Sequence, residues 1–146
     1  MTFTSFDKRM FKLARAVAES SSFKNFHLGC VVTYKKHVLS VGVNSNKTHP
    51  AQKKYNRKHR KFTKTDKPMV DSVHAEIDAL SKISYPIEQN ISWKDVKVYI
   101  YRISNGRKDG HGLARPCPAC MAALKNKGIR HIYFTTNEGY GYERLD

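Results

Sequence analysis

Long apolar runs are missing from this 146-residue sequence. Its longest apolar stretches, such as residues 29–32 and 99–101, fall far short of the roughly 20 residues that a membrane-spanning helix needs. The first 20 residues mix apolar side chains with Lys and Arg, so they lack the uninterrupted apolar core of a secretion signal. We therefore expect a cytoplasmic protein that does not cross a membrane.

Cysteine is also scarce, with only Cys30, Cys117 and Cys120 in the chain. These are too few for the disulfide framework of a small secreted protein. Two of them form a Cys-x-x-Cys pair, which in a reducing compartment favours metal or redox chemistry. With 40% hydrophobic residues, the chain is long enough for one core and too short for two ordinary domains. This predicts a single domain over residues 1–146.

Acidic residues are few, since 12 Asp and Glu face 27 Lys and Arg, for a formal net charge of +15. Such an excess attracts polyanions over distances of about a Debye length. It predicts a phosphate-bearing partner. The alternative is a lysine-rich surface that is simply solvated, because net charge reports function only loosely.

Residues 45–70 hold much of this charge and show no clear hydrophobic period, which predicts a long loop or arm. Between positions 47 and 67 there are nine cations and one acid, Asp66, with Tyr55 and Phe62 interleaved. Cations that contact phosphates, next to aromatic rings that stack bases, are typical of a single-strand nucleic-acid groove. The alternative is a solvated loop. We assign to the nucleic-acid arm Lys53, Lys54, Tyr55, Arg57, Lys58, Arg60 and Lys61.

The remaining segments alternate between helical and strand periodicity. The pattern predicts helices at about 5–20, 73–84 and 118–127, and strands at 28–34, 37–43, 97–103 and 130–135. The first two strands form a hairpin, and Gly128 ends the last helix. A loop over 104–114 and a polar, aromatic tail after residue 135 complete the chain. Helices that alternate with strands predict an α/β sandwich with a mixed sheet.

Two short motifs carry potential metal ligands. Residues 74–76 read His-Ala-Glu and residues 116–120 read Pro-Cys-Pro-Ala-Cys, and each motif opens a predicted helix, with Ser72 and Cys117 as the expected N-caps. The positive end of a helix favours thiolate, which is the form that binds metal. One imidazole and two thiolates suit zinc and leave one tetrahedral position for water, as in a catalytic site. We predict His74, Cys117 and Cys120 as zinc ligands.

Glu76 is the candidate catalytic carboxylate. In the first turn of a helix its side chain and that of His74 can both project past the helix end toward one point. Glu76 would take a proton from a water that zinc has acidified toward a pKa of ~7, and pass it to a ring nitrogen and a leaving amine.

Each motif alone is compatible with a different role. A Cys-x-x-Cys pair also occurs in structural zinc sites and in redox pairs. With His111 or Cys30 as a fourth ligand, the site would instead belong to a non-catalytic zinc module that binds nucleic acid, but such a module has no use for Glu76. Cys30 reads more simply as a buried strand residue, and His111 as a loop residue at the rim of a pocket.

Together, the two motifs resemble the signature of the cytidine and deoxycytidylate deaminase superfamily, which also includes tRNA adenosine deaminases and polynucleotide cytosine deaminases. The similarity runs from residue 28 to about 135. It implies a three-layer α/β/α sandwich with a mixed sheet of about five strands, a Zn²⁺ cofactor, and members that commonly form oligomers. It also implies that Asn44 binds the sugar or phosphate side of the substrate, that the Ala75 backbone holds the base edge, and that the base stacks near Phe26 or His27.

Other residues extend or limit this resemblance. Arg102 and Arg115 flank the pocket-facing loop and could meet a phosphate, or could be surface arginines. Residues 45–70 are longer and more basic than in compact members, and Asp78 differs from the residue types of the well-known subgroups. We therefore expect a zinc-dependent hydrolytic deaminase that favours cytosine over adenine. Single-stranded nucleic acid is slightly favoured as its substrate over free dCMP or CMP.

Overall fold

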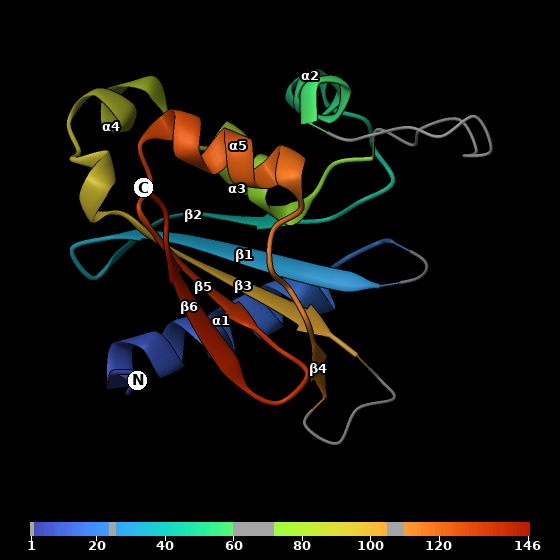
Figure 1. Cartoon of the computed structure of the whole chain (residues 1–146), viewed down its shortest axis with the longest axis vertical. Helices are drawn as coiled ribbons and strands as arrows, with labels where there is room; N and C mark the ends of the chain where they lie inside the picture. The colour runs from blue at the N-terminus through green and yellow to red at the C-terminus, as the bar shows by residue number, and fades with distance from the viewer. Residues whose placement is uncertain (1, 24–25, 60–71, 105–109) are drawn as a thin grey trace.

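The computed structural model describes residues 2–23, 26–59, 72–104 and 110–146. A mixed β-sheet lies between two layers of helices (Figure 1). The helices are α1 (Ser5–Glu19), α2 (Pro50–His59), α3 (Ala75–Ser81), α4 (Tyr85–Gln89) and α5 (Pro118–Lys127), with a short 3-10 turn at Trp93–Asp95. The strands are β1 (His27–Tyr34), β2 (His37–Val43), β3 (Lys97–Ile103), β4 (His111–Gly112), β5 (His131–Thr135) and β6 (Tyr140–Arg144).

The sheet has the order β2-β1-β3-β5-β6, and β4 pairs with the end of β3. β1 is antiparallel to both of its neighbours, so Cys30 lies opposite Gly42 on β2 and Ile100 on β3. β3 and β5 are parallel, which requires a crossover, and α5 provides it. The predicted α/β/α sandwich with a mixed sheet is confirmed. Within the described residues the sheet has six strands, where about five were expected.

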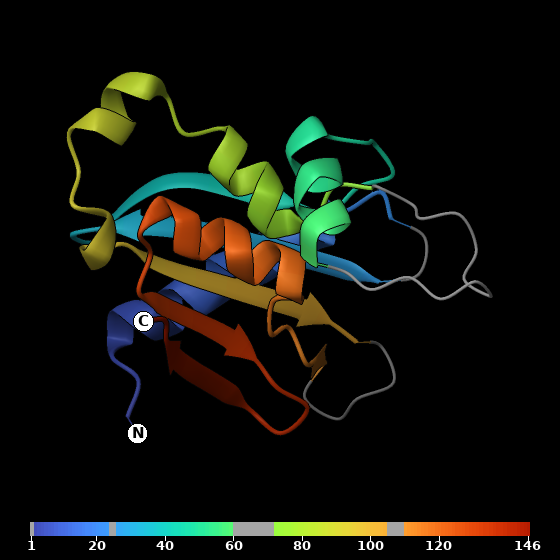
Figure 2. The ribbon, with the colours of Figure 1, turned by 45° about the horizontal axis from the view of Figure 1, so that its top comes forward.

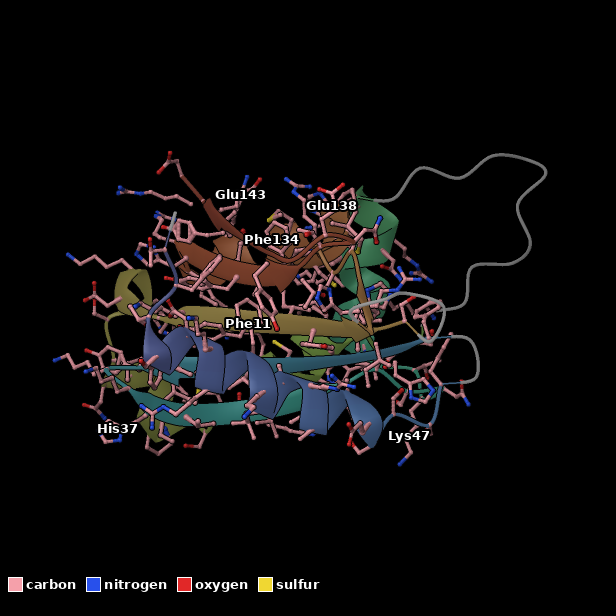
Figure 3. The ribbon with its side chains drawn as sticks, turned by 90° about the horizontal axis from the view of Figure 1, so that it is seen from below. Phe11, His37, Lys47, Phe134, Glu138 and Glu143 are labelled. Atoms are coloured by element: carbon pink, nitrogen blue, oxygen red, sulfur yellow. The ribbon has the colours of Figure 1, made fainter. Side chains whose placement is uncertain are left out.

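One face of the sheet is covered by α1, which buries Phe11, Ala14 and Ala18. The helix begins with a reciprocal cap, in which the Thr4 hydroxyl accepts from the Asp7 N–H and the Asp7 carboxylate accepts from the Thr4 N–H. Figure 3 looks onto this layer, with α1 in front of the strands, and Phe11 of this helix joins Val31 and Tyr99 of the sheet in a buried cluster. The same view places His37, at the β1–β2 turn, and Lys47, beyond the end of β2, at opposite ends of the molecule.

The other face is covered by α2, α3 and α5, which lie together on the side opposite α1 (Figure 2). Ile77, Leu80 and Leu124 from these helices join Val98 and Ile132 of the sheet in one buried apolar cluster. Gly42 allows α3 to lie directly on β2, because a Cβ atom there would stand 2.3 Å from the Ala75 carbonyl oxygen. The first turn of α3, which carries the His-Ala-Glu motif, is therefore held against the end of the sheet.

The prediction of a loop over residues 45–70 is wrong for residues 50–59, which form α2. The helix begins with a proline at its first position, and its buried residues are Gln52 and Asn56. Because two amides rather than apolar side chains occupy its buried face, the hydrophobic pattern gave no helical signal. Arg60 and Lys61 of the predicted arm lie outside the described residues.

Three smaller expectations also need correction. The predicted helix at 73–84 is shorter, since α3 ends at Ser81 and α4 begins separately at Tyr85 with Pro86 in its first turn. Its N-cap is His74 and not Ser72. The aromatic tail after residue 135 contains β6, which completes the edge of the sheet. In the described parts of the chain, no helix combines the length and hydropathy that a membrane span requires.

Candidate active site

The N-terminal ends of α3 and α5 bring the three predicted zinc ligands together. His74 is the N-cap of α3, and Cys117 is the N-cap of α5 with Cys120 in its first turn. Nδ1 of His74 lies 3.2 Å from the Sγ atom of Cys120 and 3.6 Å from that of Cys117. Within the described residues, this is the only group of three or more His, Cys, Asp or Glu whose ligand atoms lie within 4.8 Å of one another.

The donor set fits a zinc ion. Zinc bonds of roughly 2.0 Å to imidazole and 2.3 Å to thiolate place the ligand atoms of a tetrahedral site about 3.5 Å apart, close to the separations seen here. Pro118 occupies the first helical position after Cys117, where its missing N–H costs no hydrogen bond. The two cysteine side chains are therefore fixed on a regular helical turn.

The two thiols differ in acidity because they share a hydrogen bond. The Cys120 thiol donates to Cys117, and this bond, with a further contribution from His74, lowers the pKa of Cys117 to about 3. The same hydrogen bond and burial raise the pKa of Cys120. The shared hydrogen bond therefore favours the thiolate form of Cys117, and binding of a metal by both sulfur atoms would require Cys120 to lose its proton as well.

Glu76 lies in the first turn of α3, with 3% of its surface exposed. Burial raises the pKa of its carboxyl group, while the neighbouring His74 acts in the opposite direction. His74, Glu76 and Cys117 all line one cavity of about 230 Å³. A carboxyl group with a raised pKa beside a metal-ligand set is the arrangement expected of a group that both accepts and donates protons.

Five of the predicted substrate residues line the same cavity: Phe26, Asn44, Ala75, Arg102 and Arg115. Among the described residues that line the cavity, His27 is absent and Leu28 is present. Neighbouring residues of a strand point to opposite faces of the sheet, so only one of these two side chains can point toward the cavity. Leu113 and Ala114 also line the cavity and were missed. The available sequence signal was an apolar residue, Leu113, in a loop that holds three glycines, and the structure leaves this leucine half exposed.

Asn44 is buried and holds the mouth of the cavity together. Its Oδ1 accepts hydrogen bonds from the Leu28 N–H at 2.9 Å and from the Ser21 hydroxyl at 2.7 Å, and its Nδ2 donates to the Phe26 carbonyl at 3.0 Å. Both oxygen lone pairs are therefore used within the protein. The second N–H of Nδ2 is the part of this amide that a substrate would meet.

The two arginines of the cavity are held differently. The Arg102 guanidinium lies over the ring of Phe26, 5.1 Å from its centre. Arg115 forms an ion pair with Glu143, with Nη2 3.0 Å from a carboxylate oxygen, and both side chains remain partly exposed. Exposed ion pairs of this kind are weak, so an incoming phosphate can compete for Arg115.

The other candidate ligands lie elsewhere. Cys30 is buried in β1, where burial raises the pKa of its thiol, as expected for a structural residue. His111 is not at the pocket rim but in β4, where its Nδ1 lies 2.7 Å from the Thr136 carbonyl and its ring stacks on Tyr140. Asp78 accepts from the Val43 N–H and so ties α3 to the end of β2. Within the described residues, the metal group has three protein ligands.

The predicted arm residues on α2 lie outside the cavity. Lys53, Lys54, Arg57 and Lys58 are exposed, and none of them lines the cavity. Tyr55 is half-buried against the core, and its hydroxyl accepts a hydrogen bond from Asn126 on α5. On the buried side of α2, Gln52 contacts the backbone of His74, a contact that no sequence pattern indicated.

The protein-family model described as the cytidine and deoxycytidylate deaminase zinc-binding region matches residues 4–136 of this sequence. The chain belongs to this family. It is therefore a hydrolytic deaminase of the zinc type that acts on C–N bonds, and the predicted zinc cofactor fits the His74, Cys117 and Cys120 group. Among curated proteins, no sequence matches this deaminase.

Solved structures with the same fold include two kinds of deaminase. A dCMP deaminase from the cyanophage S-TIM5 is 18% identical, with a TM-score of 0.59 over 92% of this chain and 86% of the other. A cytidine deaminase from Burkholderia pseudomallei is 13% identical, with a TM-score of 0.60 over 97% and 93%. A cytidine deaminase from Mycobacterium leprae is 18% identical, with a TM-score of 0.53 over 96% and 94%. At these identities the likeness shows the fold.

Proposed function

We propose that this deaminase hydrolyses the amine of cytosine in a free nucleotide such as dCMP or CMP, to give the uracil nucleotide and ammonia. The observation that carries the proposal is that Glu76, two of the three predicted zinc ligands and two arginines line one cavity. One end of this cavity suits a proton-transfer reaction, and the arginines suit a single phosphate.

Glu76 moves the protons in this reaction. Bound zinc supplies the Lewis acidity that makes water a nucleophile at neutral pH. The Glu76 carboxylate accepts one proton from the attacking water and delivers it to the ring nitrogen of the base, which keeps it in the uracil product. It then accepts the second proton from the hydroxyl group of the adduct and delivers it to the amine, which leaves as ammonia when the C–N bond breaks and the carbonyl forms. Because burial raises the pKa of Glu76, the carboxyl group holds the proton between these steps more readily than an exposed glutamate would.

The cavity walls orient the base and the sugar. Ala75 is the first residue of α3, so its N–H has no partner within the helix and can donate to the carbonyl oxygen of the base. Phe26, which is 38% exposed and has the Arg102 guanidinium over its ring, lines the cavity where the base can contact the edge of this ring. Asn44 offers its remaining N–H to the sugar.

Arg102 and Arg115 supply the phosphate contacts. Both line the cavity, and a guanidinium group can grip a phosphate through two parallel hydrogen bonds. Two arginines match one phosphate monoester better than a long polyanion. For this reason we propose a free nucleotide as the substrate, although the sequence alone slightly favoured single-stranded nucleic acid.

Single-stranded nucleic acid is the second candidate, and the exposed cations of α2 favour it. Lys53, Lys54, Arg57 and Lys58 present four positive charges on one short helix. Against this candidate, the hydroxyl of Tyr55 is bound to Asn126 and its ring packs against the core, so this ring is not a free stacking platform.

The test compares substrates on one preparation of zinc-loaded protein. Release of ammonia from dCMP, CMP, deoxycytidine, adenosine monophosphate, single-stranded DNA and tRNA would be measured, with Glu76→Gln as the matched inactive variant. We expect turnover of dCMP or CMP, with KM raised at least tenfold for the unphosphorylated nucleoside because a charged hydrogen bond is lost. Turnover of DNA or tRNA alone would refute the nucleotide proposal and support the second candidate.

A further inference from the structure

The buried side of α2 contacts the backbone of a predicted zinc ligand. Gln52 is fully buried, and its Oε1 accepts a hydrogen bond from the His74 N–H at 3.0 Å. Its Nε2 donates to Oδ1 of Asn56, which is one turn further along α2 and is also fully buried. A buried primary amide held at both ends has one orientation available to it.

His74 depends on this contact because of its place in the chain. As the N-cap of α3 it has an extended backbone, so its N–H points away from the helix and cannot be satisfied within it. Its carbonyl accepts from the Asp78 N–H at 3.0 Å, in the first turn of the helix. With Gln52 on the N–H and the helix on the carbonyl, both backbone groups that flank the imidazole are fixed.

The segment before α2 reinforces the same connection. The Ser45 N–H donates to the Val73 carbonyl, and the Val73 N–H donates to the Lys47 carbonyl at 2.8 Å. Residues 45–52 therefore bind residues 73 and 74 at three points. On its other side, α2 contacts α5 through the hydrogen bond from Asn126 to Tyr55. Helix α2 thus joins the two helices whose N-terminal ends carry His74, Cys117 and Cys120.

We propose that Gln52 is a positioning residue of the metal site, which sets the place of the His74 imidazole through its backbone N–H. The inference rests on the proposed function only in taking this group as the catalytic metal site. Groups that orient a ligand from outside the coordination sphere typically contribute 10–100-fold to metal affinity or activity. Gln52 would act through the ligand's main chain instead of its ring nitrogen.

The test measures zinc affinity of the full chain by competition with a chromophoric chelator, together with the visible spectrum of the Co²⁺-loaded protein. Gln52→Met keeps the side-chain volume but removes the acceptor, and we expect it to weaken zinc binding about 10–100-fold and to shift the Co²⁺ bands. Gln52→Glu keeps an oxygen that accepts the same N–H, while its second oxygen requires the Asn56 amide to turn over and donate to it. With that turn, we expect an affinity within about threefold of the native value.

Tyr55→Phe is the matched control, because it removes a hydrogen bond of α2 that touches none of the ligands. Its zinc affinity should stay within about twofold of native. Unchanged affinity in Gln52→Met, or equal losses in Gln52→Met and Tyr55→Phe, would overturn the proposal. If Gln52→Met does not fold, Gln52→Glu decides, since a loss beyond about tenfold there would also overturn it. Zinc affinity needs no turnover, so failure of the deaminase proposal would be seen separately.

Discussion

At the residue scale, the chemistry of the site was readable because its motifs are short. His74 and Glu76 lie at the start of one helix, and Cys117 and Cys120 lie at the start of another, so local spacing paired the residues within each motif. That the two motifs form one site was implied by their joint resemblance to the deaminase signature. The contact of Gln52 with His74 spans 22 positions and joins a side chain to a backbone N–H. Such a contact leaves no trace in composition or period, because any buried polar residue looks the same in sequence.

Tyr99 provides a second residue-scale test, away from the metal site. Its buried hydroxyl donates to Oδ1 of Asp7 at 2.5 Å, and burial followed by this bond raises the pKa of Tyr99. A raised folded pKa means that the stabilisation is complete below the ordinary pKa of about 10 and is lost as the pH rises above it.

We predict that Tyr99→Phe lowers the free energy of unfolding by about 1–2 kcal/mol at pH 7, because Asp7 loses a partner. Above pH 10 the native protein should lose stability more steeply than the variant. Urea unfolding at pH 7 and pH 10.5 measures both effects. An equal pH dependence in the two proteins would contradict the assignment.

At the element scale, periodic apolar segments were predictable and polar or short ones were not. The strands β1, β2, β3 and β5 follow β-branched runs, and α1 follows an apolar stripe. Helix α2 was missed because Gln52 and Asn56 form its buried face, and β6 because Tyr140, Gly141 and Tyr142 resemble a loop. In both cases tertiary contacts supply the stabilisation that local propensity does not.

Two glycines allow the helical layers to approach the sheet, and they make a matched pair. A Cβ atom at Gly42 would lie 2.3 Å from backbone atoms of α3, and one at Gly29 would lie 2.2 Å from the Ala14 carbonyl of α1. We predict that Gly42→Ala and Gly29→Ala both lower the unfolding free energy by about 1–3 kcal/mol through overpacking.

Only Gly42→Ala should also weaken zinc binding, because α3 carries His74 and Glu76 while α1 carries no ligand. Thermal unfolding and zinc competition on the two variants separate the effects. Equal zinc affinities in Gly42→Ala and Gly29→Ala would show that the seat of α3 on β2 does not position the site.

A substitution in the β1–β2 hairpin should change the stability of the protein without changing its active site. Lys35 and Lys36 both adopt left-handed backbone angles, with φ of 48° and 65°, in a turn that favours Asn-Gly. We expect Lys36→Gly to raise the free energy of unfolding by about 1 kcal/mol, because a strained conformation becomes an allowed one. Chemical denaturation measures this. Unchanged or lower stability would contradict it, and deaminase activity should remain at the native level.

For the whole molecule, the fold puts the reactive groups at one end of the sheet. The cavity is lined by residues at the start of β1, just after the end of β2 and near the end of β3. The N-terminal ends of α3 and α5 contribute residues to the same cavity. The order of helices and strands predicted an α/β sandwich with a mixed sheet, and the resemblance to the deaminase superfamily implied its three layers. The substrate was harder to predict, because net charge acts over the whole surface whereas specificity depends on the few groups that line one cavity.

The most direct test of the central claim is ammonia release from cytosine nucleotides, measured beside zinc content in the native protein, Cys117→Ser and Glu76→Gln. We predict one zinc per chain and turnover in the native protein, and loss of both in Cys117→Ser. Glu76→Gln should keep its zinc and lose at least about a hundredfold in kcat, as expected when a proton-transfer group is removed. Native-level turnover in zinc-free protein or in Glu76→Gln would contradict the account.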